Sequence, residues 1–194
     1  TPFLVQVDTN TIYLRIPSFG NQHKKSIDQL IAHNKHLITS TPNLIIDIRN
    51  GTGGSDNSYY ELLPFLYTNP IRMPAVEFLS TPLNNKRMYE LATNTGIAQE
   101  FKLNPSAAEM ERYKAYYELL NNNIGTFVNL SGNKVNVKKL DTIYPYPQHV
   151  AIMINENNVS TDEQFLLEAK QSKKVKLYGR TTKGGLDVSN LSLV

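Results

Sequence analysis

The chain contains two continuous apolar runs of strand length, residues 43–48 and 149–154, which constrain its fold more than any other feature. A run without polar alternation is typical of a strand that is covered on both faces, as in parallel sheets flanked by helices. A β-rich run over residues 11–16 precedes the first of them, with a helical pattern over residues 26–38 in between. We therefore predict an α/β domain in which residues 11–48 form a β-α-β unit.

The amino-terminal segment is predicted to be a hairpin followed by a helix. Residues 3–7 and 11–16 are β-rich, and Asp8 to Asn10 between them have turn chemistry. The helix is expected to begin at Ser26, because Gln29 stands in the capping-box position three residues later. Residues at helical spacing form its predicted buried face, namely Ile27, Leu30, Ile31, Asn34 and Ile38.

The character of the chain changes between the two apolar runs. Residues 80–148 are rich in Asn and Tyr and carry no signal of a buried strand. We therefore divide the chain into a first core segment (1–79), an insertion that could serve as a lid (80–148), and a second core segment (149–194). The fold class expected is α/β with a largely helical insertion.

The remaining predicted elements are short. In chain order they are a helix after the loop at residues 49–56, lined by Tyr59, Leu62, Leu63 and Leu66; a break over 70–74; a strand over 75–79; a helix from Ser106 to Asn123; two strands, 127–130 and 134–140, that pair with each other; a helix over 160–171; a strand over 175–178; and a last strand after Gly185.

Composition excludes several function classes. There is no cysteine, which rules out disulfides, thiolate metal ligands and a cysteine nucleophile. The 20 Lys and Arg exceed the 17 Asp and Glu only slightly and are evenly spread, so no nucleic-acid partner is expected. No apolar run approaches the ~20 residues needed to cross a bilayer. The histidines show no metal-ligand spacing and no nucleotide motif is present, so we expect no cofactor and no metal.

Three loops are predicted to meet at one edge of the sheet, where ligands gather in α/β folds. They are residues 51–54, 157–160 and 181–185. The glycine-rich loop at 51–54 could present backbone N–H groups to an anion. A plain strand-to-helix turn that requires glycine is the alternative, and the loop alone does not separate the two.

Ser160 is the candidate nucleophile in these loops. It lies between the second apolar run and a helix start, so its hydroxyl would stand at the positive end of the helix, where a developing oxyanion is favoured. The N–H of Thr161 could serve as a donor. The alternative is that Ser160 and Glu163 form a capping box, and the spacing is compatible with both interpretations.

Four segments together resemble the core domain of the S41 serine peptidases, the C-terminal processing or tail-specific proteases, a family that includes the tricorn core. They are residues 13–19, 44–54, 157–165 and 178–185, and their order and spacing match over nearly the whole chain. The sequence around the glycine loop is similar to that of members from Bacteroidetes-type bacteria.

This resemblance implies a ClpP/crotonase-like α/β spiral and a serine mechanism. It makes Ser160 the nucleophile, and it makes the N–H groups of Thr161 and Gly53 the oxyanion hole. It implies a peptide or protein substrate and an extracytoplasmic location, in the periplasm or cell envelope. The chain starts without Met and ends in an apolar stretch, so further domains of a longer protein are expected.

The general base departs from the family pattern. Gly185 stands where the processing proteases carry a lysine, and Arg15 stands where the tricorn branch carries a histidine. Arginine stays protonated and cannot accept the serine proton. Lys183 would share a strand face with position 185, but its ammonium would need desolvation to act as a base. The other options are a base outside this chain or an inactive domain.

The sequence thus predicts a serine endopeptidase core that acts on unfolded or C-terminal peptide segments through an acyl-enzyme. The alternative is an inactive peptide-binding or scaffolding domain that lacks a general base. A crotonase-type acyl-CoA enzyme is a third option, suggested by fold only, and it would require a basic pocket that the sequence does not show.

Overall fold

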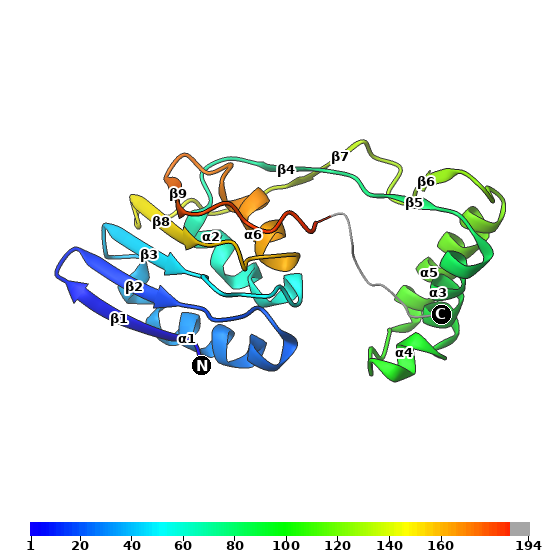
Figure 1. Ribbon diagram of the computed structural model, residues 1–194, viewed down its shortest axis with the longest axis horizontal. Helices are drawn as coiled ribbons and strands as arrows, with labels where there is room; N and C mark the ends of the chain where they lie inside the picture. Colours follow the sequence, from blue (N-terminus) through cyan, green and yellow to red (C-terminus); the bar gives the residue numbers. More distant parts are fainter. Residues whose placement is uncertain (187–194) are drawn as a thin grey trace. The chain divides into compact units, whose positions relative to one another are not determined.

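In the computed structural model, which describes residues 1–186, five strands form one sheet in the order β1-β2-β3-β8-β9 (Figure 1). They are β1 (Phe3–Asp8), β2 (Thr11–Arg15), β3 (Asn43–Asp47), β8 (His149–Ile154) and β9 (Val175–Gly179). β1 and β2 are antiparallel, and every other neighbouring pair is parallel. The predicted α/β class with a mostly parallel central sheet is confirmed.

The predicted hairpin and β-α-β unit are both present. Helix α1 (Asn21–Ile38) carries the chain from β2 to β3, and Ile27, Ile31 and Ile38 on its inner face are buried. The predicted start at Ser26 is wrong, because the helix begins at Asn21 with Gly20 as its N-cap. The Ser26 hydroxyl instead donates to the carbonyl of His23 within the helix, at 2.8 Å. No side-chain cap marks the true start, which explains why the sequence pattern missed it.

The segment after β3 coils more tightly than predicted. Two 3-10 turns, η1 (Asp56–Ser58) and η2 (Tyr60–Leu62), lead into the short helix α2 (Leu63–Leu66). The apolar side chains expected to line one helix are all buried here: Tyr59, Leu62, Leu63 and Leu66. Helix α6 (Thr161–Ala169) follows β8 and packs Phe165 and Leu166 into the same core.

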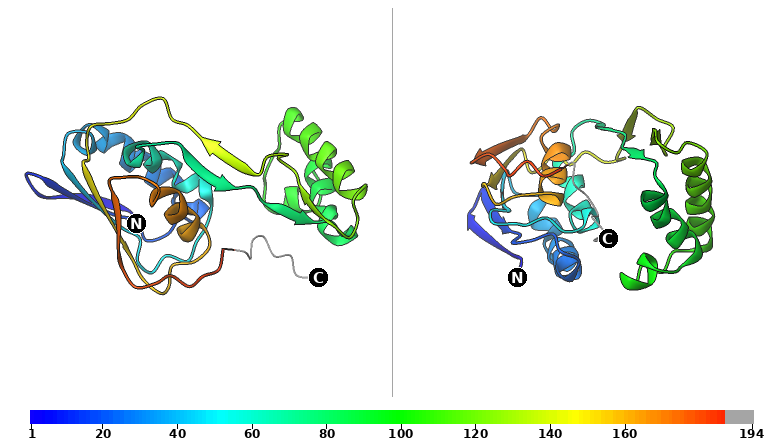
Figure 2. Two further views of the ribbon diagram at one scale, coloured as in Figure 1. Left: turned by 90° about the horizontal axis from the view of Figure 1, so that it is seen from above. Right: turned by 45° about the vertical axis from the view of Figure 1, so that its right-hand side comes forward.

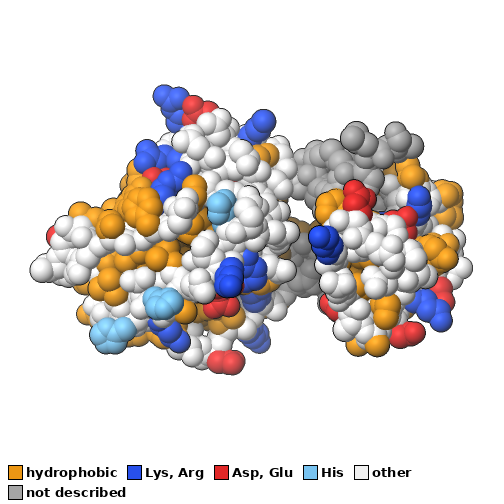
Figure 3. Space-filling model, turned by 90° about the horizontal axis from the view of Figure 1, so that it is seen from below, with side chains coloured by type: hydrophobic (Ala, Val, Ile, Leu, Met, Phe, Trp, Pro, Cys, Tyr) orange, Lys and Arg blue, Asp and Glu red, His pale blue; other side chains and the backbone are white. Residues whose placement is uncertain are grey.

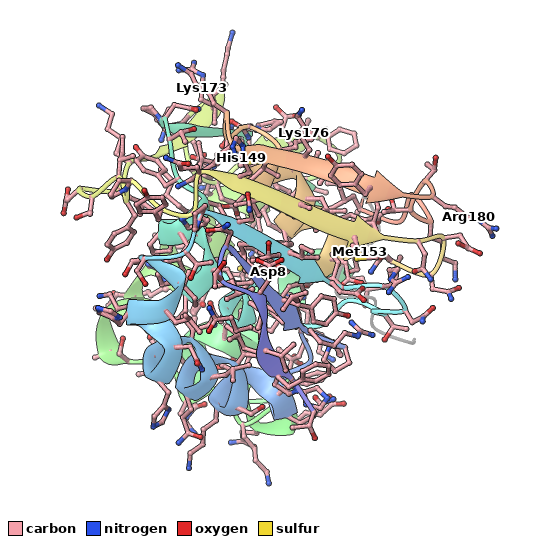
Figure 4. The ribbon with its side chains drawn as sticks, turned by 90° about the vertical axis from the view of Figure 1, so that its left-hand side faces the viewer. Asp8, His149, Met153, Lys173, Lys176 and Arg180 are labelled. Carbon is pink, nitrogen blue, oxygen red and sulfur yellow. The ribbon has the colours of Figure 1, made fainter. Side chains whose placement is uncertain are left out.

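The main core lies between one face of the sheet and these helices. Leu14, Ile46 and Ile152 from three adjacent strands are buried there against Ile27 and Phe165. On the other face Tyr13, Ile45 and Ala151 are only half-buried. Figure 4 looks onto that face, with Met153 and Lys176 among its labelled side chains. Within residues 1–186, the expectation that β3 and β8 are covered on both faces is therefore wrong.

The chain divides into two compact units, which have separate cores. Unit 1 holds the sheet described above and is built from Thr1–Met73 and the chain from Val137 onward; unit 2 is Pro74–Asn136. The predicted segment boundaries lay at residues 79 and 148. The predicted last strand after Gly185 lies outside the described residues.

Unit 2 is largely helical. Its elements are β5 (Glu77–Leu79), α3 (Pro82–Thr93), α4 (Ile97–Glu100), α5 (Ala107–Asn121) and β6 (Phe127–Asn129). Its small core includes Met88, Leu91 and Leu120, from the two longer helices. The predicted long helix is confirmed, and it begins with a capping box between Ser106 and Glu109.

Two paired strands carry the chain between the units, β4 (Ile71–Pro74) outward and β7 (Val135–Lys138) back (Figure 2). The predicted pairing of residues 127–130 with 134–140 is wrong, because β6 pairs with β5 and β7 with β4. The predicted break over 70–74 is likewise a strand. These pairings join residues about 50 to 65 positions apart in the chain, which local turn chemistry does not reveal.

Candidate active site

Ser160 occupies the turn between β8 and α6 and is the N-cap residue of that helix. Its backbone angles are φ 57° and ψ −119°, a conformation that side-chain-bearing residues rarely adopt. Such strain costs about 1–3 kcal/mol and tends to occur at functional sites. The serine therefore stands at the positive end of α6 in a strained strand-to-helix turn.

The glycine loop lies directly against this turn. Gly53 has φ +82°, and a Cβ added to it would lie 2.9 Å from Ser160 Cβ and 3.4 Å from Ser160 Oγ. Gly53 and Ser160 come from the loops that follow β3 and β8, which are parallel neighbours in the sheet. The structure thus brings together two of the predicted site residues at the carboxyl edge of the sheet, and only glycine fits at position 53.

The first turn of α6 holds the surrounding segments in place. Thr161 is 5% exposed, and its side chain acts to lower the pKa of Asp56, which follows the glycine loop, against the larger opposite effect of burial. Asp162 Oδ2 accepts a hydrogen bond from the N–H of Gly53 at 3.3 Å. Sequence reasoning had proposed Gly53 as an oxyanion donor but had given Asp162 no role.

Glu163 connects the Ser160 turn to the third predicted loop. Its Oε2 accepts from the N–H groups of Ser160, at 3.0 Å, and Gly185, at 2.8 Å, while Oε1 accepts from Gly184 N–H at 2.6 Å. Burial acts to raise the pKa of Glu163, but hydrogen bonds from Thr182 and from these three N–H groups outweigh it, so the pKa is lowered. The ionised carboxylate holds the loop and the turn together.

The capping box offered as the alternative for Ser160 and Glu163 is present at the start of α6, and Glu163 has a wider role beside it. The glutamate accepts from the N–H of Ser160, as a capping box requires, and the same carboxylate also binds a loop more than 20 residues further along the chain. The S/T-x-x-E pattern predicted the contact between Glu163 and the N–H of Ser160. No local sequence pattern indicated the contact between Glu163 and the distant loop.

Arg15, at the position of the tricorn histidine, binds the backbone. Its guanidinium donates to the carbonyl oxygens of Ile16, Asp47 and Arg49 at 2.7–2.9 Å. Burial acts to raise the pKa of Asp47, but hydrogen bonds from Arg49 and Tyr13 outweigh it and lower the pKa to about 2. These groups line an open cavity of about 410 Å³, and they bond to one another, which is the pattern of a structural network.

Lys183, the in-chain candidate for the general base, is exposed. Its backbone N–H donates to the carbonyl of Asn158 at 2.9 Å, which places its loop beside the Ser160 turn. The structure thus brings the loop of Lys183 to the site, and a role of the lysine as the base stays a prediction.

A buried polar cluster supports the far end of α6. Glu168 is 5% exposed and accepts a hydrogen bond from the hydroxyl of Tyr59 at 2.9 Å. Lys138 forms an ion pair with the same carboxylate at 2.8 Å. Burial, together with the neighbouring carboxylates of Asp56 and Glu168, raises the pKa of Tyr59. This cluster satisfies a buried charge and fixes the helix that carries Ser160 at its start.

The distribution of charged side chains on the surface does not indicate a class of binding partner. Basic and acidic side chains are scattered over the face seen in Figure 3 and do not gather into one patch. Among residues 1–186, no helix combines the length and the apolar character needed to cross a membrane. In the same part of the chain, no cluster of three or more histidine, aspartate and glutamate side chains could hold a metal ion.

Comparisons with known proteins give one family match and several solved structures of similar fold. The sequence profile of peptidase family S41 matches residues 10–193. Mature CPAF in complex with lactacystin is 21% identical with a TM-score of 0.53, and the match covers 90% of this chain and 38% of that chain. A putative peptidase from Parabacteroides merdae ATCC 43184 is 15% identical with a TM-score of 0.55, covering 94% and 44% of the two chains. No curated protein sequence matches. The chain thus spans less than half the length of these solved structures.

Proposed function

Because the chain belongs to peptidase family S41, we propose that it is the core of a serine endopeptidase and that Ser160 is its nucleophile. The observation that carries the proposal is the strained turn of Ser160 packed against Gly53 at the start of α6. A structural serine in this position gains nothing from a positive φ, whereas a nucleophile gains exposure at a helix start.

In the proposed reaction, Ser160 Oγ attacks the carbonyl carbon of a peptide bond. The negative charge that develops on the carbonyl oxygen is stabilised by the positive end of α6, by the N–H of Thr161 and by an N–H of the glycine loop, for which Gly53 is the candidate. The amine leaves with a proton, and water then hydrolyses the acyl-enzyme. The substrate proposed is an unfolded or C-terminal segment of a protein.

The proposed role of Gly53 includes a rearrangement at its N–H. That group donates to Asp162 at 3.3 Å, which is longer than the usual range for such a bond. An N–H can be shared between two acceptors. The oxyanion would therefore share or take over this donor during the reaction.

A second candidate function is supported by the side chains at the two family base positions. Arg15 is committed to three backbone carbonyls, and Gly185 has no side chain to contribute. A domain with a nucleophile turn but no base would bind peptides without cleaving them. It would differ from the first candidate in the reactivity of Ser160.

Labelling with a fluorophosphonate probe separates the two functions, since the probe reacts with activated serines. We expect the full-length protein to be labelled, with the adduct located at Ser160 by mass spectrometry. Ser160→Ala is the control: it should abolish labelling and leave the circular dichroism spectrum unchanged. A folded full-length protein that resists labelling would contradict the peptidase function and favour the binding function.

A further inference from the structure

Asp162 is a buried carboxyl group that the proposed reaction does not use. Its side chain is 0% exposed, and no ion pair joins it to a cation among the described residues. One of its oxygens, Oδ1, is buried without any hydrogen-bond partner. Burying a carboxyl group in this way is costly, so its retention calls for a compensating role.

The other oxygen makes the contacts of this side chain. Oδ2 accepts from Asn158 Nδ2 at 3.0 Å and from the N–H of Gly53 at 3.3 Å. The same Asn158 nitrogen donates to the carbonyl of Ile48 at 2.7 Å. A single oxygen therefore connects the glycine loop after β3 with the loop after β8, two residues from Ser160.

The glycine loop also rests on this carboxyl group by direct contact. A Cβ added to Gly51 would collide with the Asp162 carboxyl, with Oδ1 at 2.9 Å and Oδ2 closer still. Gly51 does not have a positive φ, so the backbone does not itself demand glycine there. The carboxyl group explains the glycine, and it fixes how near the loop approaches the Ser160 turn.

We propose that Asp162 is a positioning residue, which holds the glycine loop against the Ser160 turn through its Oδ2. Burial raises the pKa of Asp162, while the hydrogen bonds from Asn158 and Gly53 act against it. A neutral carboxyl still accepts both hydrogen bonds through its carbonyl oxygen. The effect on catalysis rests on the proposed function, whereas the effect on the loop does not.

Two substitutions at position 162 test the proposal. Asp162→Ala removes the acceptor, and Asp162→Asn keeps an oxygen that can replace Oδ2 and places an amide at the unpartnered Oδ1. At saturating fluorophosphonate, we expect Ala to lower the rate constant of Ser160 labelling on the order of 10- to 100-fold. This is less than the roughly 100- to 1,000-fold cost of losing an oxyanion donor outright, because Gly53 keeps its N–H. We expect Asn to restore it to within about threefold of wild type, with little change in probe affinity in either variant.

A second readout does not depend on activity. Amide hydrogen exchange measured by NMR should show faster exchange at Gly51 to Gly54 in Asp162→Ala, and wild-type rates in Asp162→Asn. Glu168→Gln is the matched control, since it alters another buried carboxyl of α6 at the opposite end of the helix. It should lower stability without changing exchange in the glycine loop relative to the rest of unit 1.

Gly51→Ala approaches the same contact from the loop side and covers the case in which Asp162→Ala does not fold. It should speed loop exchange and slow labelling while unit 1 stays folded. Wild-type exchange in the loop of Asp162→Ala or of Gly51→Ala would overturn the proposal, as would a loss of protection spread over all of unit 1 that Asn does not rescue. If wild-type Ser160 is not labelled at all, the proposed function fails and the exchange data still decide the role of Asp162.

Discussion

At the scale of single residues, Ser160 combines two demands that oppose each other. Its φ of 57° favours glycine, yet the proposed reaction requires the hydroxyl that glycine lacks. The strain of about 1–3 kcal/mol is offset by the contacts that Glu163 and its neighbours make around the turn. A residue chosen for stability alone would be glycine.

We therefore expect Ser160→Gly to be more stable than Ser160→Ala by about 1 kcal/mol, because glycine relieves the positive φ and alanine does not. Glycine is already preferred to alanine at an N-cap position, and the positive φ adds to that preference. Urea denaturation of both variants measures the difference, and neither variant should react with the fluorophosphonate probe. If alanine proved the more stable, the turn would not be strained.

At the scale of elements, the first turn of α6 organises the site because its two carboxyl groups hold different segments. Asp162 binds the glycine loop, and Glu163 binds Gly184 and Gly185. The start of α6 is thus surrounded by loops that its own side chains hold in place.

Glu163→Gln should release the loop at residues 182–185. Both carboxylate oxygens accept N–H groups, and glutamine offers one acceptor and one donor in their place. We expect a loss of about 2 kcal/mol in the free energy of unfolding at pH 7 and faster tryptic cleavage at Arg180 and Lys183.

The destabilisation caused by Glu163→Gln should be larger at neutral pH than at acidic pH. Since the folded-state pKa of Glu163 is lowered, its contribution to stability is present above about pH 4.5 and is lost as the pH falls through the folded-state value. The difference between wild type and Glu163→Gln should therefore shrink toward acidic pH. A difference that is constant from pH 7 to pH 3 would contradict the role assigned to the ionised carboxylate.

The elements themselves were largely predictable from the sequence, because strand and helix periodicity are local signals. Residues 11–16, 43–48 and 149–154 were found as strands, and Ser160 was placed at a helix start. What escaped prediction depends on distant partners, such as the β4/β7 pairing and the contact of Asp162 with Gly53. The exposed second face of the sheet was not predicted either. An apolar run such as Leu44 to Ile48 does not indicate whether helices cover one face of the sheet or both.

At the scale of the whole molecule, the two units have cores that share no residue. Ser160, Gly53, Asp162 and Glu163 all belong to unit 1, and so do the core residues that support them. The fold of the candidate site therefore should not require unit 2. A role for unit 2 as a lid stays a prediction.

Deleting residues 75–134 and joining Pro74 to Val135 through an Asn-Gly turn should leave unit 1 folded, because β4 and β7 already pair at these ends. We expect one cooperative thermal transition and unchanged labelling of Ser160 by the small probe. Loss of cooperative unfolding would show that unit 1 depends on unit 2. Unchanged labelling together with altered cleavage of an unfolded protein would support the lid.

The β4/β7 ladder has a consequence for how this chain can diversify. Paired strands lie about 4.8 Å apart, so the first and last residues of unit 2 lie close together. Any module whose termini lie that close can occupy the same place without disturbing the sheet behind it. We therefore expect residues 75–134 to tolerate lengthening, shortening or exchange as the tip of a hairpin does, without a change at the serine turn.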